Sequence, residues 1–164
     1  MASGNSLIIF RAQDSRPPST NGATFDLRNN HPLLDFDDTT DESVDFEGVL
    51  PRNYAGGGLT VYIHYCDEAV AGVLIWQAAF ERIGDGSQDI DSDGFAAAQS
   101  SASLTVPATS GNVDIASIAF TDGAQMDSVA VGEAFRLRIN RDADNILDTL
   151  VGDANLLFVE LKET

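Results

Sequence analysis

Three aspartates at alternate positions, Asp89, Asp91 and Asp93, precede Gly94 and form the motif most suggestive of chemistry. Hard oxygen ligands at the first, third and fifth positions of a loop, with a glycine for the sharp turn, suit Ca²⁺. The twelfth position, where a calcium loop carries its closing glutamate, is Ser100, and no helical pattern flanks the motif. The segment does not predict an EF-hand. Two interpretations remain, a structural calcium site and a plain acidic turn.

Residue types that could perform catalysis are sparse. His31 and His64 lie in separate segments, and neither has a nucleophile pattern nearby. The sequence also lacks a phosphate-binding glycine loop and the metalloprotease His-Glu-x-x-His motif. Cys66 is the only cysteine, which excludes a disulfide within the chain. It closes an apolar strand, so we expect a buried thiol. We expect that the protein is not an enzyme and that it binds no cofactor other than the Ca²⁺ considered above.

Positive charge is scarce and partly clustered. Three of the nine basic residues, Arg136, Arg138 and Arg141, fall on one predicted strand and its end. A guanidinium group pairs with a carboxylate through two parallel hydrogen bonds. In a chain with 26 acidic residues, these arginines could bind acidic groups of a neighbouring subunit or pair within the chain. The sequence leaves both alternatives open.

The elements that carry these residues are predicted to be strands. Residues 58–66 alternate between two faces, and residues 70–83 are apolar on both faces, so the second strand must be covered on both sides. Further strands are expected at 101–107, 112–120, 132–141 and 154–162. No long helical period is present. The pattern predicts an all-β protein, an antiparallel β-sandwich, and the long connections favour a jelly roll. The sandwich domain is expected to span 48–164.

Residues 1–47 have a different character from the rest of the chain. They contain Pro17, Pro18 and Pro32 and only short apolar islands, which predicts an extended N-terminal arm or a set of edge strands. The run 35–47 contains seven acidic residues. It is interpreted as a solvated face, or as a contact or cation-binding segment.

The charge balance excludes several partners. Nine basic against 26 acidic residues give a net charge of −17, which argues against nucleic acid and against anionic membranes. No apolar run is long enough to cross a bilayer. The N-terminus lacks the basic and apolar regions of a signal peptide, so we expect folding in a cytoplasm.

Three stretches resemble a known group of proteins: residues 49–65, 73–95 and 131–161, which together cover most of the chain beyond residue 48. They are similar to small proteins encoded among the structural genes of tailed bacteriophages and prophages. The resemblance implies a virion protein, a jelly-roll head decoration (cement) protein on the capsid exterior. Such a protein would be a homotrimer, assembled in the host cytoplasm, that bridges subunits of the major capsid protein and stabilises the mature head.

On this hypothesis the arm and the arginine cluster would contact capsid or sister subunits. The candidate contact residues are Leu7, Ile8, Ile9, Phe10, Phe25, Leu33, Leu34, Phe36, Arg136, Arg138 and Arg141.

The alternative hypothesis is a carbohydrate-binding β-sandwich module, in a tail fibre, a spike or an unrelated protein. Its ligand would pack on aromatic residues of a sheet face, for which Tyr62, Tyr65 and Trp76 are the candidates. Calcium at Asp89, Asp91 and Asp93 would suit the same function. Trp76 lies in the middle of an apolar run, which favours the core for that residue.

Overall fold

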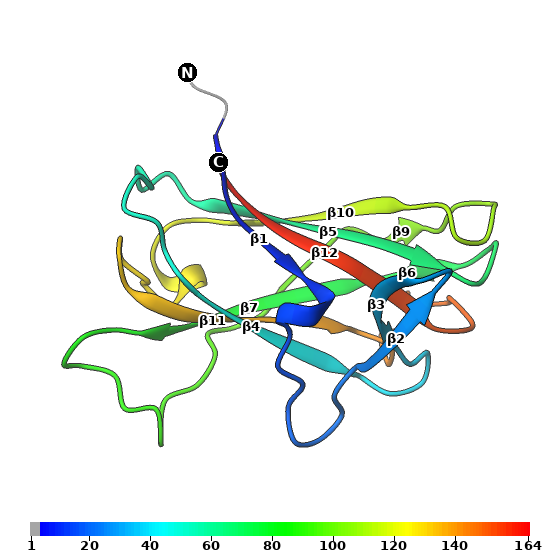
Figure 1. The fold of residues 1–164 in the computed structure, drawn as a ribbon, viewed down its shortest axis with the longest axis horizontal. Helices are drawn as coiled ribbons and strands as arrows, with labels where there is room; N and C mark the ends of the chain where they lie inside the picture. The colour runs from blue at the N-terminus through cyan, green and yellow to red at the C-terminus, as the bar shows by residue number, and fades with distance from the viewer. Residues whose placement is uncertain (1–3) are drawn as a thin grey trace.

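Two facing antiparallel sheets make up the protein in the computed structural model, which describes residues 4–164 (Figure 1). The larger sheet contains β1 (Ser6–Arg11), β2 (Thr24–Arg28), β3 (His31–Phe36), β5 (Leu59–Asp67), β10 (Asp114–Phe120) and β12 (Ala154–Glu163). Its strand order is β10-β5-β12-β3-β2, and β1 also pairs with β12. The smaller sheet contains β4 (Ser43–Val49), β7 (Trp76–Ile83), β8 (Gln99–Ser100) and β11 (Ala134–Arg141), in the order β4-β11-β7-β8.

Little other regular structure is present in the described residues. A two-stranded ribbon joins β6 (Val73–Leu74) to β9 (Leu104–Thr105), and two single turns of 3₁₀-helix occur at η1 (Ala12–Asp14) and η2 (Ala124–Met126). Within residues 4–164, no helix has the length and apolar character needed to span a membrane. The prediction of an antiparallel all-β sandwich is confirmed.

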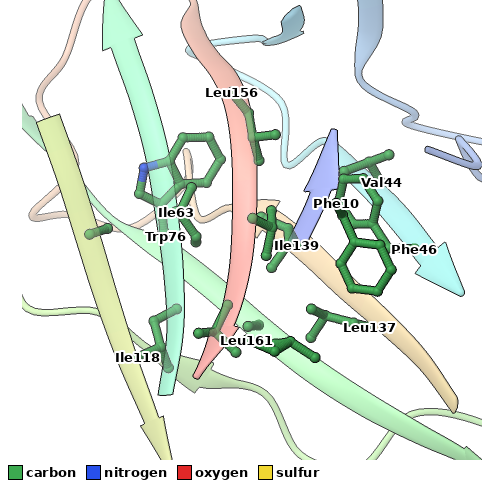
Figure 2. Close-up of a cluster of buried hydrophobic side chains, with 14 of the residues drawn as sticks. Phe10, Val44, Phe46, Ile63, Trp76, Ile118, Leu137, Ile139, Leu156 and Leu161 are labelled. Atoms are coloured by element: carbon green, nitrogen blue, oxygen red, sulfur yellow. The ribbon is translucent and has the colours of Figure 1, made fainter. Parts of the chain in front are cut away.

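The core lies between the two sheets because each long strand turns alternate apolar side chains inward (Figure 2). Trp76 is completely buried there. Its ring packs edge-on against Phe36, with centroids 4.9 Å apart, and against Tyr65 at 5.8 Å. The prediction that Trp76 belongs to the core is confirmed, and Tyr65 joins it. Neither residue can offer its ring to a ligand on the sheet surface.

The N-terminal segment is extended as expected, but it does not project from the sandwich. β1 and β3 both pair with β12, β1 along its C-terminal half and β3 along its first residues. β4 forms an edge of the smaller sheet. Residues 6–49 therefore supply strands to both sheets, which corrects the expectation of an arm separate from a domain beginning at residue 48. β12, the strand that pairs with β1 and β3, lies more than 100 residues away from both in the chain.

The outer side of β7 is covered by the chain itself. Arg138 makes two hydrogen bonds to Asp45, at 2.7 and 2.9 Å, and Arg136 forms an ion pair with Glu81. Both guanidinium groups lie over the ring of Phe95, 4.3 and 4.9 Å from its centroid. Pairing within the chain is thus the alternative that the structure supports for these two arginines, and the two-sided strand needs no other subunit to cover it.

Candidate functional site

The structure places the expected contact residues in two different environments. Phe10, Leu33, Leu34, Phe36 and Arg141 are buried. Arg141 binds Asp148 through two hydrogen bonds, at 3.0 and 3.1 Å, and donates to three backbone carbonyls. These five residues cannot reach a partner surface in this fold, because apolar packing or hydrogen bonding inside the sandwich already engages them. The expectation that they form contacts is corrected.

The other expected contact residues are accessible at least in part, and their role stays a prediction. Leu7 and Ile8 are partly buried against the core, whereas Ile9 and Phe25 are exposed. Arg136 and Arg138 remain about one-third exposed beside their carboxylate partners.

The predicted calcium loop lies exposed between β7 and β8. The carboxylate of Asp93 accepts the backbone N–H of Asp89 at 2.6 Å, and that of Asp89 accepts the N–H of Asp91 at 3.0 Å. These bonds give the loop the form of an acidic turn. Carboxylate oxygens of Asp41, Asp142 and Asp144 approach one another within 4.8 Å and could hold a metal ion. Calcium binding at Asp89, Asp91 and Asp93 stays a prediction.

The outer face of the larger sheet carries a row of side chains that crosses four strands. Register places Arg11 of β1 opposite Phe158 of β12, Phe158 opposite His64 of β5, and His64 opposite Ile115 of β10. Phe158 is 44% exposed. The His64 ring meets it edge-on, with centroids 6.3 Å apart and an interplanar angle of 88°. Directly opposite residues share a face of the sheet, so the row forms an aromatic ridge open to solvent.

A second row lies two residues further along the same face. It contains Ile9, Glu160, Tyr62 and Ser117, again matched by register. The ammonium group of Lys162 lies 6.0 Å from the centroid of the Tyr62 ring. Glu160 accepts a hydrogen bond from the hydroxyl of Ser6. Hydrogen-bonding groups therefore flank the aromatic rings.

Beside Phe158 the face is hollowed. A hollow of about 510 Å³ lies between Phe158, His31 and Arg28. Arg28 forms one wall, where it donates hydrogen bonds to the carbonyl of Asp67 at 3.1 Å and to the hydroxyl of Ser110 at 2.8 Å. Two further hollows adjoin Phe158 and Tyr62. We call this surface the outer-face site. It comprises Arg11, Arg28, His31, Tyr62, His64, Phe158, Glu160 and Lys162.

Below the hollow, Cys66 is buried as expected. Burial raises the pKa of its thiol, although the guanidinium of Arg28 opposes that rise. The nearby carboxyl of Asp35 has its pKa raised to about 6 by burial and by the charge of Asp26. The side-chain amide of Asn155 donates to it at 2.5 Å. A thiol with a raised pKa is a poor nucleophile. The chemistry that the face offers is therefore noncovalent binding, by apolar rings and hydrogen-bonding groups.

Sequence reasoning located part of this site. Tyr62 was a candidate aromatic residue and does lie on the face, whereas Tyr65 and Trp76 point into the core. Phe158 and Arg11 were missed. The alternation of 154–162 predicts a strand but not which of its residues faces solvent, because a bulge between Leu156 and Phe158 shifts the register.

Comparisons with known proteins identify the fold. No protein-family model matches the chain, and no curated protein matches its sequence. Among solved structures, the CBM22-2 xylan-binding domain of Xyn10C from Paenibacillus barcinonensis aligns with a TM-score of 0.57 and 13% identity. That alignment covers 97% of this chain and 100% of the domain.

Two further structures align over almost their full length. The C-terminal CBM6 of LamC, a marine laminarinase from Zobellia galactanivorans, has a TM-score of 0.51 and 10% identity, covering 96% of this chain and 99% of that one. A carbohydrate-binding module of Cellvibrio mixtus lichenase 5A, in complex with cellotriose, has a TM-score of 0.50 and 12% identity, covering 98% and 99%.

These comparisons concern the expectation of a phage virion protein and the expectation that the chain is not an enzyme. The matched structures are β-sandwich carbohydrate-binding modules, and nothing among the findings indicates a phage virion protein. At 10–13% identity these likenesses concern the fold alone, so the expectation that the chain is not an enzyme stays a prediction. The capsid partner, the homotrimer and the virion location stay predictions.

Proposed function

We propose that this chain is a carbohydrate-binding module that holds an oligosaccharide on the outer-face site. The observation that carries the proposal is the aromatic ridge of Phe158 and His64, with Tyr62 beside it, on an open sheet face. A sugar ring presents apolar C–H groups on its faces and hydroxyls around its edge. An exposed aromatic ring can bury the C–H groups of the sugar, and flanking polar side chains can bind its hydroxyls.

Two further features support this function. The hollows beside Phe158 are open to solvent, which suits a chain that lies along the face. The fold is shared with modules named for the binding of xylan and other carbohydrates. At this low identity the likeness concerns the fold alone, so the proposal depends on the residues of the face.

The test compares two phenylalanines of similar exposure. Phe158 is 44% exposed on the proposed site, and Phe25 is 50% exposed on edge strand β2, away from the hollows. Isothermal titration with xylo-, cello- and β-1,3-gluco-oligosaccharides would measure Kd for the wild type, Phe158→Ala and Phe25→Ala. We expect about tenfold weaker binding for Phe158→Ala, from the loss of one ring contact of about 1.4 kcal/mol, and no change for Phe25→Ala. Equal binding by both variants would place the ligand elsewhere, and no binding by the wild type to any carbohydrate would refute the proposal.

A further inference from the structure

The outer-face site has more positive than negative side chains, although the chain as a whole is acidic. Three cationic side chains, those of Arg11, Arg28 and Lys162, line its three hollows together with the imidazoles of His31 and His64. One carboxylate, that of Glu160, lines the same hollows. The whole chain has 26 acidic residues against nine lysines and arginines. The balance of charge at this face is therefore the reverse of the balance in the chain.

The positive charges on this face are not used by ion pairs. In the described part of the chain, the salt bridges engage Arg82, Arg136, Arg138 and Arg141. None of them includes Arg11, Arg28 or Lys162. Arg28 donates instead to uncharged acceptors, among them the side-chain oxygen of Asn155 at 3.0 Å and the hydroxyl of Ser110 at 2.8 Å. Those contacts fix the guanidinium group in the wall of the hollow, where its charge also acts on the buried carboxyl of Asp67.

The spacing of the cations follows the aromatic ridge. Arg11 lies opposite Phe158 by register, and Arg28 lies in the hollow that Phe158 also lines. Lys162 is four residues beyond Phe158 on the same side of β12, which corresponds to about 13 Å along a strand. A chain-like ligand packed on Phe158 can therefore reach cations at both ends of the face.

On the premise that the outer-face site binds carbohydrate, we propose that its ligand is an anionic polysaccharide. Its uronate carboxylates or sulfate esters pair with Arg11, Arg28 and Lys162, while a sugar ring packs on Phe158. Charge-assisted hydrogen bonds to such groups are roughly twice as strong as neutral ones. The net charge of −17 repels a polyanion at long range. Salt at about 0.15 M screens that repulsion beyond about 8 Å, so the short contacts decide binding.

The first experiment uses ligands that differ only in charge. Polygalacturonate is compared with its fully methyl-esterified form, and dextran sulfate with dextran, by titration calorimetry in 0.15 M salt. We expect at least one anionic form to bind tenfold or more tightly than its neutral counterpart. Preference for polygalacturonate would identify a carboxylate ligand, and preference for dextran sulfate a sulfate ester. Equal Kd values within both pairs would overturn the proposal.

The second experiment locates the effect on the face. Arg11→Gln and Lys162→Gln each remove one positive charge from the site, and Arg52→Gln removes one from an exposed position outside the hollows. We expect the double variant Arg11→Gln/Lys162→Gln to bind the anionic ligand about tenfold more weakly, from two partly exposed charge contacts, and Arg52→Gln to bind as the wild type does. A similar loss in Arg52→Gln would show nonspecific attraction and overturn the proposal.

Failure of this inference and failure of the proposed function are distinguishable. If neutral and anionic chains bind equally and Phe158→Ala weakens both, the face binds carbohydrate without a charge requirement, and only the anionic ligand is refuted. If neither neutral nor anionic chains bind, both the carbohydrate function and the inference of an anionic ligand are refuted.

Discussion

Asp67, at the end of β5, has a buried carboxylate whose two oxygens find no hydrogen-bond partner among the described residues. The residue is 2% exposed. Burial raises the pKa of this carboxyl to about 6, although Arg141 and Arg28 act in the opposite direction. The folded protein therefore binds a proton at this position more tightly than the unfolded chain does. Substitution by asparagine, which has nearly the same shape and no charge, removes this difference.

The magnitude follows from the two pKa values. A pKa of about 6 instead of 3.8 lowers the free energy of unfolding by about 3 kcal/mol when the carboxyl is charged, at 1.36 kcal/mol for each pH unit. Above pH 6 the folded protein bears this whole cost, since the carboxylate is charged in both states. As the pH falls, the folded state takes up the proton first and the cost shrinks, to about 1 kcal/mol at pH 4.5. Below the unfolded pKa the cost disappears.

We expect Asp67→Asn to raise the free energy of unfolding at pH 7 by about 1–3 kcal/mol, the lower value applying if the new amide also lacks a partner. The gain should fall to about 1 kcal/mol or less at pH 4.5. Urea unfolding of the wild type and of Asp67→Asn at the two pH values measures this gain. Subtracting one stability from the other cancels the general effect of the high net charge. Asp91→Asn, on an exposed loop, is the control and should change stability by less than about 0.5 kcal/mol. An Asp67→Asn variant less stable than the wild type at pH 7 would refute the reasoning.

Four other outcomes are expected. Asp148→Ala should cost about 3–5 kcal/mol in urea unfolding, because it leaves the buried charge of Arg141 without its carboxylate. The fluorescence of Trp76 should be blue-shifted and unchanged by any carbohydrate, since the ring is fully buried; a ligand-induced shift would contradict its place in the core. If calcium is bound at Asp89, Asp91 and Asp93, EDTA should lower the melting temperature; an unchanged value would favour the acidic turn that the backbone N–H bonds to Asp89 and Asp93 form. Light scattering should give the mass of three chains if the predicted homotrimer forms, and the mass of one chain would contradict it.

The sequence predicted the strands whose signal is local. Residues 58–66 alternate cleanly and form β5, and the pattern at 132–141 corresponds to β11. The first strands were interpreted as an extended arm or a set of edge strands, because their apolar islands are short. What makes them part of the sandwich is pairing with β12, as between Ser6 and Lys162. No local pattern encodes such a pairing.

The lack of a local signal for strand pairing also explains why the sequence predicted only part of the candidate site. Arg11, His64 and Phe158 come from three strands, and only the register brings them into one row. The sequence did indicate aromatic residues, yet two of the three it named belong to the core. The arginine cluster could be recognised from its spacing, but its partners Asp45 and Glu81 could not, since they lie on neighbouring strands of the smaller sheet.

The central place of β12 has a consequence for biosynthesis. This strand lies between β5 on one side and β1 and β3 on the other, yet the ribosome makes it after all of them. Until residues 154–163 have left the exit tunnel, three strands present unpaired edges and an incomplete apolar face. Such edges are prone to aggregation, so the nascent chain is most vulnerable to it during this interval. Consolidation of the larger sheet is therefore a late event, and a stalled or truncated product lacking β12 would be a substrate for proteolysis.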